Sequence, residues 1–263
     1  MRRLSSKGGF LLRVWGIGTL LLVALSVPVR ESRAADFAVS PMGLELEQGA
    51  RSGTINVRNF DKQPIRFEVR GMEWSQDESG RNIYADSKSL IWFPRALELA
   101  PGESRIIRVG VRATPASREQ AYTVFLKEVV LGGAQAGQAR GAQIQLLLSV
   151  SVPVFVPPAK PVPGGTIESV ELRGGRLNIV VANGGNRHYS YQDAVIVGRG
   201  VDGTEKFRQK VRGRTLLAGS RQRVELSIPP DACRQSRALA VTLTSSEQSE
   251  IKRQLDVSRA DCE

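Results

Sequence analysis

The sequence has very few of the residues that most often perform catalysis or bind metals. Its one histidine, His188, lies beside a turn in NGGNRHYSY, and no partners of a catalytic triad are recognisable around it. We interpret it as a surface or packing residue. The two cysteines, Cys233 and Cys262, do not form a Cys-x-x-Cys motif. No metal site, no cofactor and no enzymatic activity are predicted.

Other signatures of ligand sites are also missing. The Gly-Gly pairs follow no strand–loop–helix pattern, so they are typical of turns and not of phosphate-binding loops. Scattered Asp and Glu residues give no sign of the facing carboxylates that glycoside hydrolysis needs. Beyond the N-terminal segment only Trp74 and Trp92 are available to stack on sugars. An exported hydrolase or sugar-binding module is therefore poorly supported.

Long apolar runs are absent except at the N-terminus, which reads MRRLSSKGGFLLRVWGIGTLLLVALSVPVRESRAADF. A basic start, an uncharged run over 14–29 and small residues at Ser32 and Ala34 predict a cleaved secretory signal peptide over 1–34. The alternative is an uncleaved anchor, for which this run is short. We predict a chain exported to the periplasm, without stable membrane insertion after cleavage.

The charge left after this cleavage is moderate. Removing 1–34 takes six basic residues and one acidic residue from totals of 37 and 26, which leaves a net charge of +6. The basic residues alternate with apolar ones, as in IRFEVR at 65–70, and do not cluster. This pattern is typical of solvated strand faces, so no nucleic-acid partner is predicted.

Export also bears on the cysteines. An oxidising compartment makes a Cys233–Cys262 disulfide plausible, and the alternative is two separate buried thiols. A disulfide would join the extreme C-terminus to a strand region.

Helical periodicity of useful length is absent, whereas short strand patterns recur between turn signals. This combination predicts an all-β chain with immunoglobulin-like sandwiches. The proline-rich stretch 157–165 is predicted to be a stiff linker between an N-terminal domain over 35–156 and a C-terminal β-sandwich over 166–263. The expected strands of the N-terminal domain are 37–48, 54–59, 64–74, 90–93, 104–111, 122–130 and 143–155.

The last of these strands, QIQLLLSVSVPVF, has one strongly apolar face. Every second residue is aliphatic, with Leu147 the exception on the polar face. The aliphatic positions are Ile144, Leu146, Leu148, Val150 and Val152. Pattern alone favours packing in the chain's own core, because apolar strand faces are usually core. Pairing with another protein is the alternative.

Three segments resemble the PapD-like family of periplasmic pilus chaperones. They are LIWFPRALELAPGESRIIRV (90–109), REQAYTVFLKEV (118–129) and QIQLLLSVSVPVFVPP (143–158). The C-terminal half is a weaker match, through LNIVVANGGNRH (177–188) and RTLLAGSRQRVEL (214–226).

This resemblance implies two immunoglobulin-like domains in a boomerang arrangement. It also implies that the last N-terminal strand is lent to incomplete pilin subunits, which makes pilin subunits and an outer-membrane usher the expected partners. The groove-filling side chains would be the five aliphatic residues of that strand. With the resemblance, we favour a shared or subunit-facing role for them.

The sequence departs from the family pattern where better-studied members hold the subunit's terminal carboxylate. The expected first strand, 37–48, contains no basic residue, and Pro153 stands where those members have a lysine. The chain therefore looks like the divergent, archaic branch. Arg95, Lys127 and Arg187 are the candidate carboxylate anchors.

A secreted pilin or adhesin is the alternative to a chaperone. A pilin would be one incomplete domain with a donor extension at its N-terminus. Here ADFAVSPMG shows only a short alternation and two predicted domains follow it, which favours the chaperone.

Overall fold

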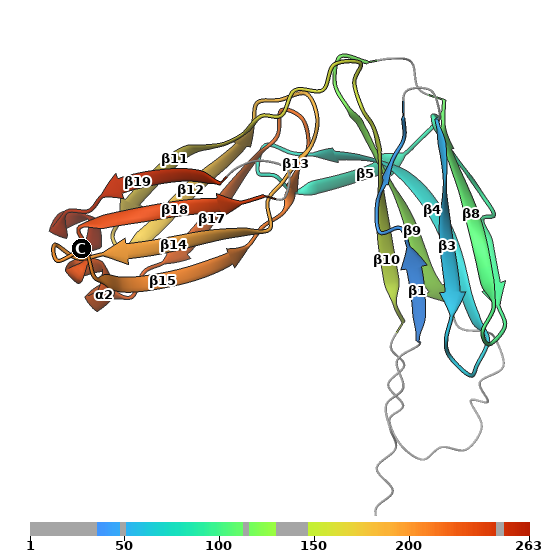
Figure 1. Ribbon diagram of the computed structural model, residues 1–263, viewed down its shortest axis with the longest axis horizontal. Coiled ribbons are helices and arrows are strands. Elements are labelled where there is room, and N and C mark those ends of the chain that lie inside the picture. Colours follow the sequence, from blue (N-terminus) through green and yellow to red (C-terminus); the bar gives the residue numbers. More distant parts are fainter. Residues whose placement is uncertain (1–35, 48–50, 113–115, 130–146, 246–249) are drawn as a thin grey trace, which may run out of the picture. The chain divides into compact units, whose positions relative to one another are not determined.

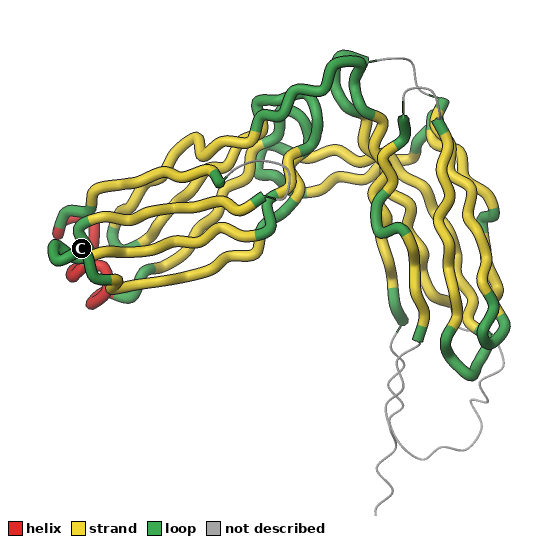
Figure 2. Tube along the Cα trace, in the orientation of Figure 1, coloured by secondary structure: helices red, strands yellow, loops and turns green. Residues whose placement is uncertain are grey.

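The computed structural model describes residues 36–47, 51–112, 116–129, 147–245 and 250–263. The predicted signal peptide lies outside these residues. Antiparallel strands dominate the chain, as the short alternating patterns predict, and they form two β-sandwiches (Figures 1 and 2). The one described α-helix, α2 (Pro230–Gln235), is short.

The first sandwich consists of two sheets. Its first sheet has the order β1-β3-β8-β6, and its second has the order β2-β10-β9-β4-β5, with β7 paired to β4. The strands of the first sheet are β1 (Phe37–Ser40), β3 (Ser52–Asn59), β8 (Ser104–Val111) and β6 (Leu90–Phe93). Those of the second are β2 (Leu44–Glu45), β10 (Ser149–Val156), β9 (Gln120–Val129), β4 (Ile65–Gln76), β5 (Asn82–Asp86) and β7 (Ala96–Leu99).

The second sandwich begins after the proline-rich stretch. Its sheets have the orders β11-β12-β17 and β15-β14-β18-β19, and β13 pairs with β16. The strands of the first are β11 (Gly165–Arg173), β12 (Arg176–Asn183) and β17 (Arg221–Ser227). Those of the second are β15 (Glu205–Arg212), β14 (Asp193–Arg199), β18 (Ala238–Thr244) and β19 (Ile251–Asp256). The two-residue strands are β13 (Tyr189–Ser190) and β16 (Thr215–Leu216).

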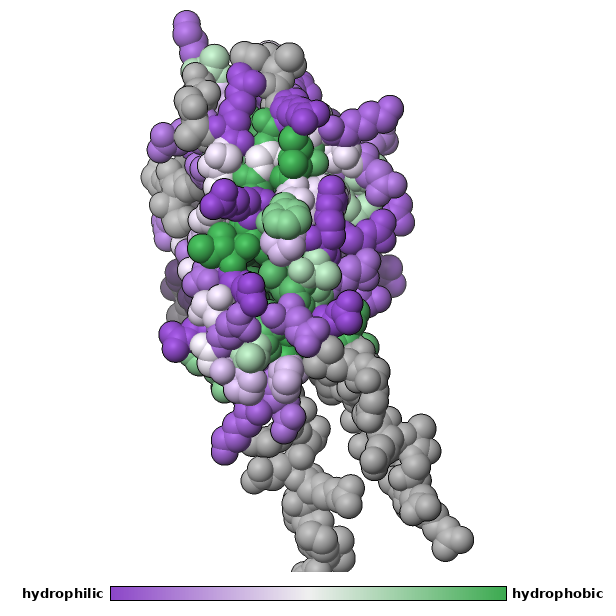
Figure 3. Space-filling view, turned by 90° about the vertical axis from the view of Figure 1, so that its right-hand side faces the viewer, coloured by the Kyte–Doolittle hydropathy of each residue, from purple (hydrophilic) through white to green (hydrophobic). Residues whose placement is uncertain are grey.

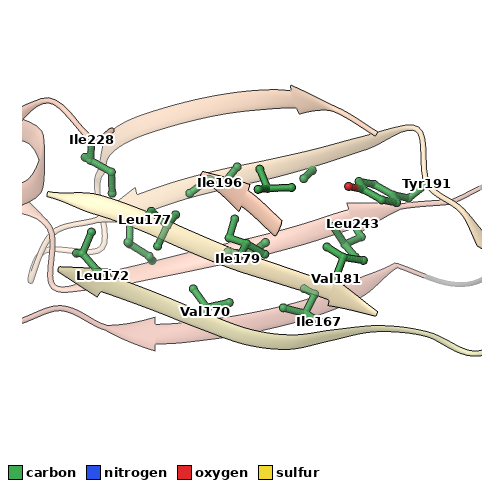
Figure 4. Close-up of a cluster of buried hydrophobic side chains, with 14 of the residues drawn as sticks. Ile167, Val170, Leu172, Leu177, Ile179, Val181, Tyr191, Ile196, Ile228 and Leu243 are labelled. Atoms are coloured by element: carbon green, nitrogen blue, oxygen red, sulfur yellow. The ribbon is translucent and has the colours of Figure 1, made fainter. Parts of the chain in front are cut away.

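Each sandwich has its own hydrophobic core, and alternation along the strands supplies it. In β4 the odd positions Ile65, Phe67 and Val69 are buried, whereas the residues between them are exposed. The second core gathers side chains from both sheets, as Figure 4 shows for residues such as Ile179 and Leu243, which are fully buried. Burial of such aliphatic side chains contributes roughly 1.5–3 kcal/mol each.

The expected first strand is divided in two by the structure. Over 37–48 the alternation predicts one strand, but β1 pairs with β3 in one sheet and β2 pairs with β10 in the other. Between them lies Pro41, which has no N–H to donate to a ladder and therefore interrupts pairing. This change of sheet places β2 beside the last strand of the first sandwich.

The two sandwiches share one hydrogen-bonding arrangement. Asn59 ends β3 and is 1% exposed; its Nδ2 donates to the carbonyl oxygens of Gln63, Leu99 and Ala100, at 2.9–3.2 Å. Asn183 ends β12, is also 1% exposed and donates to three carbonyl oxygens in the same way.

Two of the three carbonyl groups in each sandwich belong to matching turns. Each turn passes through a glycine with positive φ, Gly102 (77°) in the first sandwich and Gly219 (79°) in the second. Both glycine N–H groups donate to the carbonyl oxygen of the asparagine in question, at 3.1 and 2.9 Å. The equivalence extends to strand order, since β1-β3-β8 corresponds to β11-β12-β17 and β10-β9-β4-β5 corresponds to β19-β18-β14-β15.

Residues 35–263 form one compact unit, and specific contacts join the two sandwiches within it. The Nε2 of Gln76, at the end of β4, donates to the Thr215 carbonyl oxygen, and the Leu217 N–H donates to Gln76 Oε1, both at 2.9 Å. Phe155 of β10 packs with Ala121 and Leu217 in a small apolar cluster.

A histidine–carboxylate pair reinforces this contact. The His188 ring stacks on Phe155 with a centroid distance of 3.9 Å. Its Nδ1 lies 2.8 Å from Glu119 Oε1, and the His188 backbone N–H donates to the same oxygen at 2.8 Å. The side chains of His188 and Glu119 are 6% and 3% exposed. His188 is therefore a packing residue.

A disulfide joins Cys233 of α2 to Cys262 of the C-terminal 3₁₀ turn η1 (Arg259–Cys262), which confirms this pairing. Cys233 is buried in the second core, so the bond ties the C-terminus to that core.

Replacing both cysteines by alanine should lower the free energy of unfolding by about 3–4 kcal/mol, because the bond closes a loop with a sequence separation of 29. Urea unfolding of the purified protein measures this difference. Wild-type protein in excess dithiothreitol is the control and should show a similar loss. An unchanged midpoint in the double variant would show that the bond contributes nothing to stability.

His188→Ala should lower the free energy of unfolding by about 3–5 kcal/mol, because it removes the ring that contacts a buried carboxylate. Adding Glu119→Gln should recover part of this loss, since the carboxylate is then absent as well. A double-mutant cycle by urea unfolding measures the coupling. Additive effects of the two substitutions would contradict a direct interaction.

Candidate functional site

One edge of the first sandwich is incompletely covered. β10 pairs along its whole length with β9, from Ser149 opposite Lys127 to Val156 opposite Gln120. On its other side β2 pairs only with Val154 and Phe155. No other strand in the described ranges lies beside this edge, so within these ranges the segment 149–152 has an open side.

The hydrogen-bond pattern identifies the backbone groups on that open side. The Glu128 N–H donates to the Leu148 carbonyl oxygen, so these two residues form a hydrogen-bonded pair with β9. In an antiparallel ladder such pairs alternate with non-hydrogen-bonded pairs, whose N–H and C=O groups point away from the partner strand. Ser149, Ser151, Pro153 and Phe155 are therefore outward.

Phe155 supports this assignment. Its carbonyl oxygen accepts a hydrogen bond of 2.8 Å from the Leu46 N–H, on the side of β2. The same side of Ser149 and Ser151 therefore offers two N–H and two C=O groups, and both serines are exposed. Backbone groups in this arrangement are a template for another strand.

The aliphatic side chains on one face of β10 differ in burial along the strand. Val152 is fully buried in the first core, as is Val154 two residues later. Val150 is partly buried and packs against the same core, and Leu148 is also partly buried. Leu147, on the opposite face, is 45% exposed. Burial thus decreases toward the start of the strand.

The five predicted subunit-binding residues occupy different positions in this gradient. In the free chain Val152 belongs to its own core, and Leu148 and Val150 are only partly covered. Ile144 and Leu146 lie outside the described residues. The assignment of the five residues to a subunit remains a prediction.

The three predicted carboxylate anchors do not converge on one point. Arg95 lies over the Trp92 ring, with its guanidinium carbon 3.5 Å from the ring centroid. It lines a surface hollow with Lys88 and Arg112, to which neither β2 nor β10 contributes a residue.

Lys127 and Arg187 are closer to the open strand. Lys127 is exposed and stands opposite Ser149 on β9. Arg187 places Nη2 3.3 Å from Oε1 of Glu45, the β2 residue that pairs with Phe155. Among the three candidates, Arg187 is therefore the one that contacts the β2 end of the open edge.

Sequence reasoning missed the acidic groups at this end of β10. Glu45 Oε1 lies 3.8 Å from Nε2 of His188 in addition to its contact with Arg187, and Glu119 contacts Nδ1 of the same ring. The residues come from separate segments of the chain, so no local spacing indicates that they meet.

Other kinds of site find little support. Within the ranges that the structure describes, no three His, Cys, Asp or Glu side chains are grouped so that they could hold a metal ion. The helices in these ranges are all too short or too polar to cross a membrane.

A second exposed apolar feature lies on the outer face of the sheet β1-β3-β8-β6. Ile91, Phe93 and Ile106 are 42%, 72% and 56% exposed on β6 and β8. Figure 3 shows hydrophobic side chains among hydrophilic ones on one face of the molecule. β6, which carries Ile91 and Phe93, is itself the last strand of this sheet.

Comparison with known proteins identifies the first sandwich. A profile of the family described as pili and flagellar-assembly chaperone, PapD N-terminal domain, matches residues 36–161. Comparison of the sequence with curated proteins finds no match.

Solved structures with this fold cover most of the chain. A chain of the CsuC–CsuE chaperone–tip adhesion subunit pre-assembly complex, from the archaic chaperone-usher Csu pili of Acinetobacter baumannii, is 16% identical with a TM-score of 0.58. The match covers 83% of this chain and 98% of that one.

Two further structures are similar. A chain of the Salmonella enterica SafA pilin–SafB chaperone complex is 11% identical with a TM-score of 0.53, over 86% of this chain and 99% of that one. The YadV chaperone is 11% identical with a TM-score of 0.54, over 84% and 100%. At these identities the likeness shows the fold, and the profile match shows the family.

The profile match assigns the first sandwich to the PapD-like family of pilus chaperones, a family of chaperones and not of enzymes, and the two β-sandwiches of the whole chain have the fold of such chaperones.

Proposed function

We propose that this chain is a periplasmic chaperone that binds incomplete pilin subunits by donor-strand complementation and delivers them to an outer-membrane usher for pilus assembly. The lent strand is β10 together with the residues that precede it. The observation that carries the proposal is the open edge at Ser149 and Ser151, with aliphatic side chains only partly covered beside it.

The physical reason is that an unfinished sandwich and an open edge complete one another. An incomplete subunit exposes an apolar groove and a row of unpaired backbone groups, both of which are unfavourable in water. A strand added from the chaperone supplies backbone partners, and its alternate side chains fill the groove. Leu148 and Val150, with Ile144 and Leu146 before them, have the spacing for this role.

Burial of the aliphatic side chains in the subunit's groove would favour capture. Full burial of each aliphatic side chain contributes about 1.5–3 kcal/mol, so four such residues supply very roughly 6–12 kcal/mol before docking costs. Val152 adds little to this sum, because the free chain already buries it completely.

The proposal places the chain in the archaic branch. The expected first strand, 37–48, has no basic residue, and Pro153 stands where better-studied members have a lysine. A subunit carboxylate needs a cationic partner from elsewhere. Arg187 is the best placed of the three candidates, since it contacts Glu45 of β2.

Leu148→Asp should abolish capture and leave the chaperone folded, because the side chain is only partly buried in the free protein but would enter the subunit's groove. The matched control is Leu147→Asp, the same change one residue away on the opposite face, which should still capture. Val152→Asp places a charge in the closed core and should unfold the protein.

The measurement is co-expression with the small exported subunits encoded in neighbouring genes. Periplasmic subunit levels and co-purification report capture, and circular dichroism reports folding. Wild-type chaperone should raise the subunit levels. Unchanged levels with the wild type, or full capture by folded Leu148→Asp, would contradict the proposal.

A further inference from the structure

The open edge of β10 has a defined end. Pro153 is one of the outward residues, because it stands opposite Thr123 in the non-hydrogen-bonded phase of the β9 ladder. Proline has no backbone N–H, and the parallel pairing of Val154 with Leu44 directs the Leu44 N–H to the Pro153 carbonyl oxygen, so Pro153 offers no outward group to a further strand. Ser151 is therefore the last outward N–H donor before β2 begins.

β2 closes the edge immediately beyond this point. Leu44 and Glu45 pair with Val154 and Phe155, and the Leu46 N–H occupies the Phe155 carbonyl oxygen. Gly43 lies close to the proline, since a Cβ built on it would be 3.6 Å from Pro153 Cγ. A strand that pairs with Ser149 and Ser151 meets this obstruction when it is extended toward Phe155.

We infer that Pro153 and β2 act together as a register stop for the strand that pairs with β10. This inference rests on the proposed function and names the residues that set its geometry. Pro153 ends the exchange of hydrogen bonds, and β2 occupies the positions beyond it.

A stop of this kind is needed because register decides which side chain enters which pocket. A slip of one residue turns every side chain of a strand to the other face, and a slip of two shifts each side chain by one pocket. The aliphatic residues of β10 are similar in size, so packing alone distinguishes poorly between registers that differ by two. Pro153 lacks the N–H that a longer ladder would need, and β2 occupies the space beyond it. Together they exclude the register in which the added strand is shifted toward β2.

The free protein provides the first test. In Pro153→Ala the new N–H should exchange with solvent as fast as that of Ser151, because both point outward, whereas the Val152 and Val154 amides should be protected by β9. Residue-resolved amide exchange by NMR measures this. If the new amide at position 153 is protected in the free protein, the inference is overturned.

The second test uses the complex with the exported subunit captured in the co-expression experiment. With wild-type chaperone, the Ser149 and Ser151 amides should exchange on the order of tenfold more slowly in the complex. With Pro153→Ala, the amide introduced at position 153 should become protected as well, because the ladder can now extend. Fast exchange at this position while Ser151 is protected would overturn the role of Pro153.

Ser151→Pro provides the converse variant. The Ser151 N–H points outward, so the substitution removes no hydrogen bond to β9, unlike a proline at position 152. The variant should fold, and it should move the last protected outward amide of the complex from Ser151 to Ser149. Ser151→Ala is the matched control and should behave as the wild type. A Ser151→Pro complex with unaltered pairing beyond residue 151 would contradict the stop.

Amide exchange in the complex distinguishes a failure of the proposed function from a failure of the register stop. If Ser149 and Ser151 gain no protection in the wild-type complex, the strand does not pair and the proposed function itself is wrong. If they gain protection but the proline variants leave the end of pairing unchanged, only the register stop is wrong.

Discussion

The backbone ladder between β9 and β10 is the constraint on which the rest of the site depends. Its phase decides which residues of β10 turn their N–H and C=O groups toward β9 and which turn them outward. The same phase turns the backbone groups of Ser149, Ser151 and Pro153 away from β9. It also turns those of Phe155 away from β9, where they face β2. A shift of one residue would place Pro153 where its missing N–H breaks the ladder with β9. The position of the proline is thus compatible with only one phase of pairing.

Much of the fold could be predicted because alternation is a local signal. Strands such as β4 and β8 appear where the apolar period of two predicts them, since the same side chains that create the pattern fill the core. The sequence left a Cys233–Cys262 disulfide as one of two alternatives, and the structure contains the bond. The division of the expected first strand could not be predicted, because a period of two says which face is buried but not which sheet receives the strand.

The remaining features of the site could not be read from local spacing. Glu119 and His188 are 69 residues apart, and their contact depends on how the two sandwiches meet. The burial gradient along β10 also depends on tertiary structure, since the pattern gives Leu148 and Val152 the same role. Only the core that lies beneath Val152 distinguishes them. The sequence does contain the residues of the Asn59 and Asn183 arrangements, an Asn at a strand end and a Gly in a later turn. This pattern involves too few residues to be recognised without the structure.

Asn59 and Asn183 hold equivalent positions in the two sandwiches, so the strands of one sandwich can be matched to those of the other. In this match β19 is the counterpart of β10. β19 is the last strand of its sheet, and β10 is followed only by the two-residue β2, but the side chains of the two strands differ. β19 presents exposed Lys252, Arg253 and Gln254, and Arg253 donates to the Ile167 and Glu168 carbonyl oxygens of β11. Charge of this kind protects an edge against unwanted pairing. The same architecture therefore carries, in one polypeptide, a strand edge that is open at Ser149 and Ser151 and a second edge that charged side chains protect.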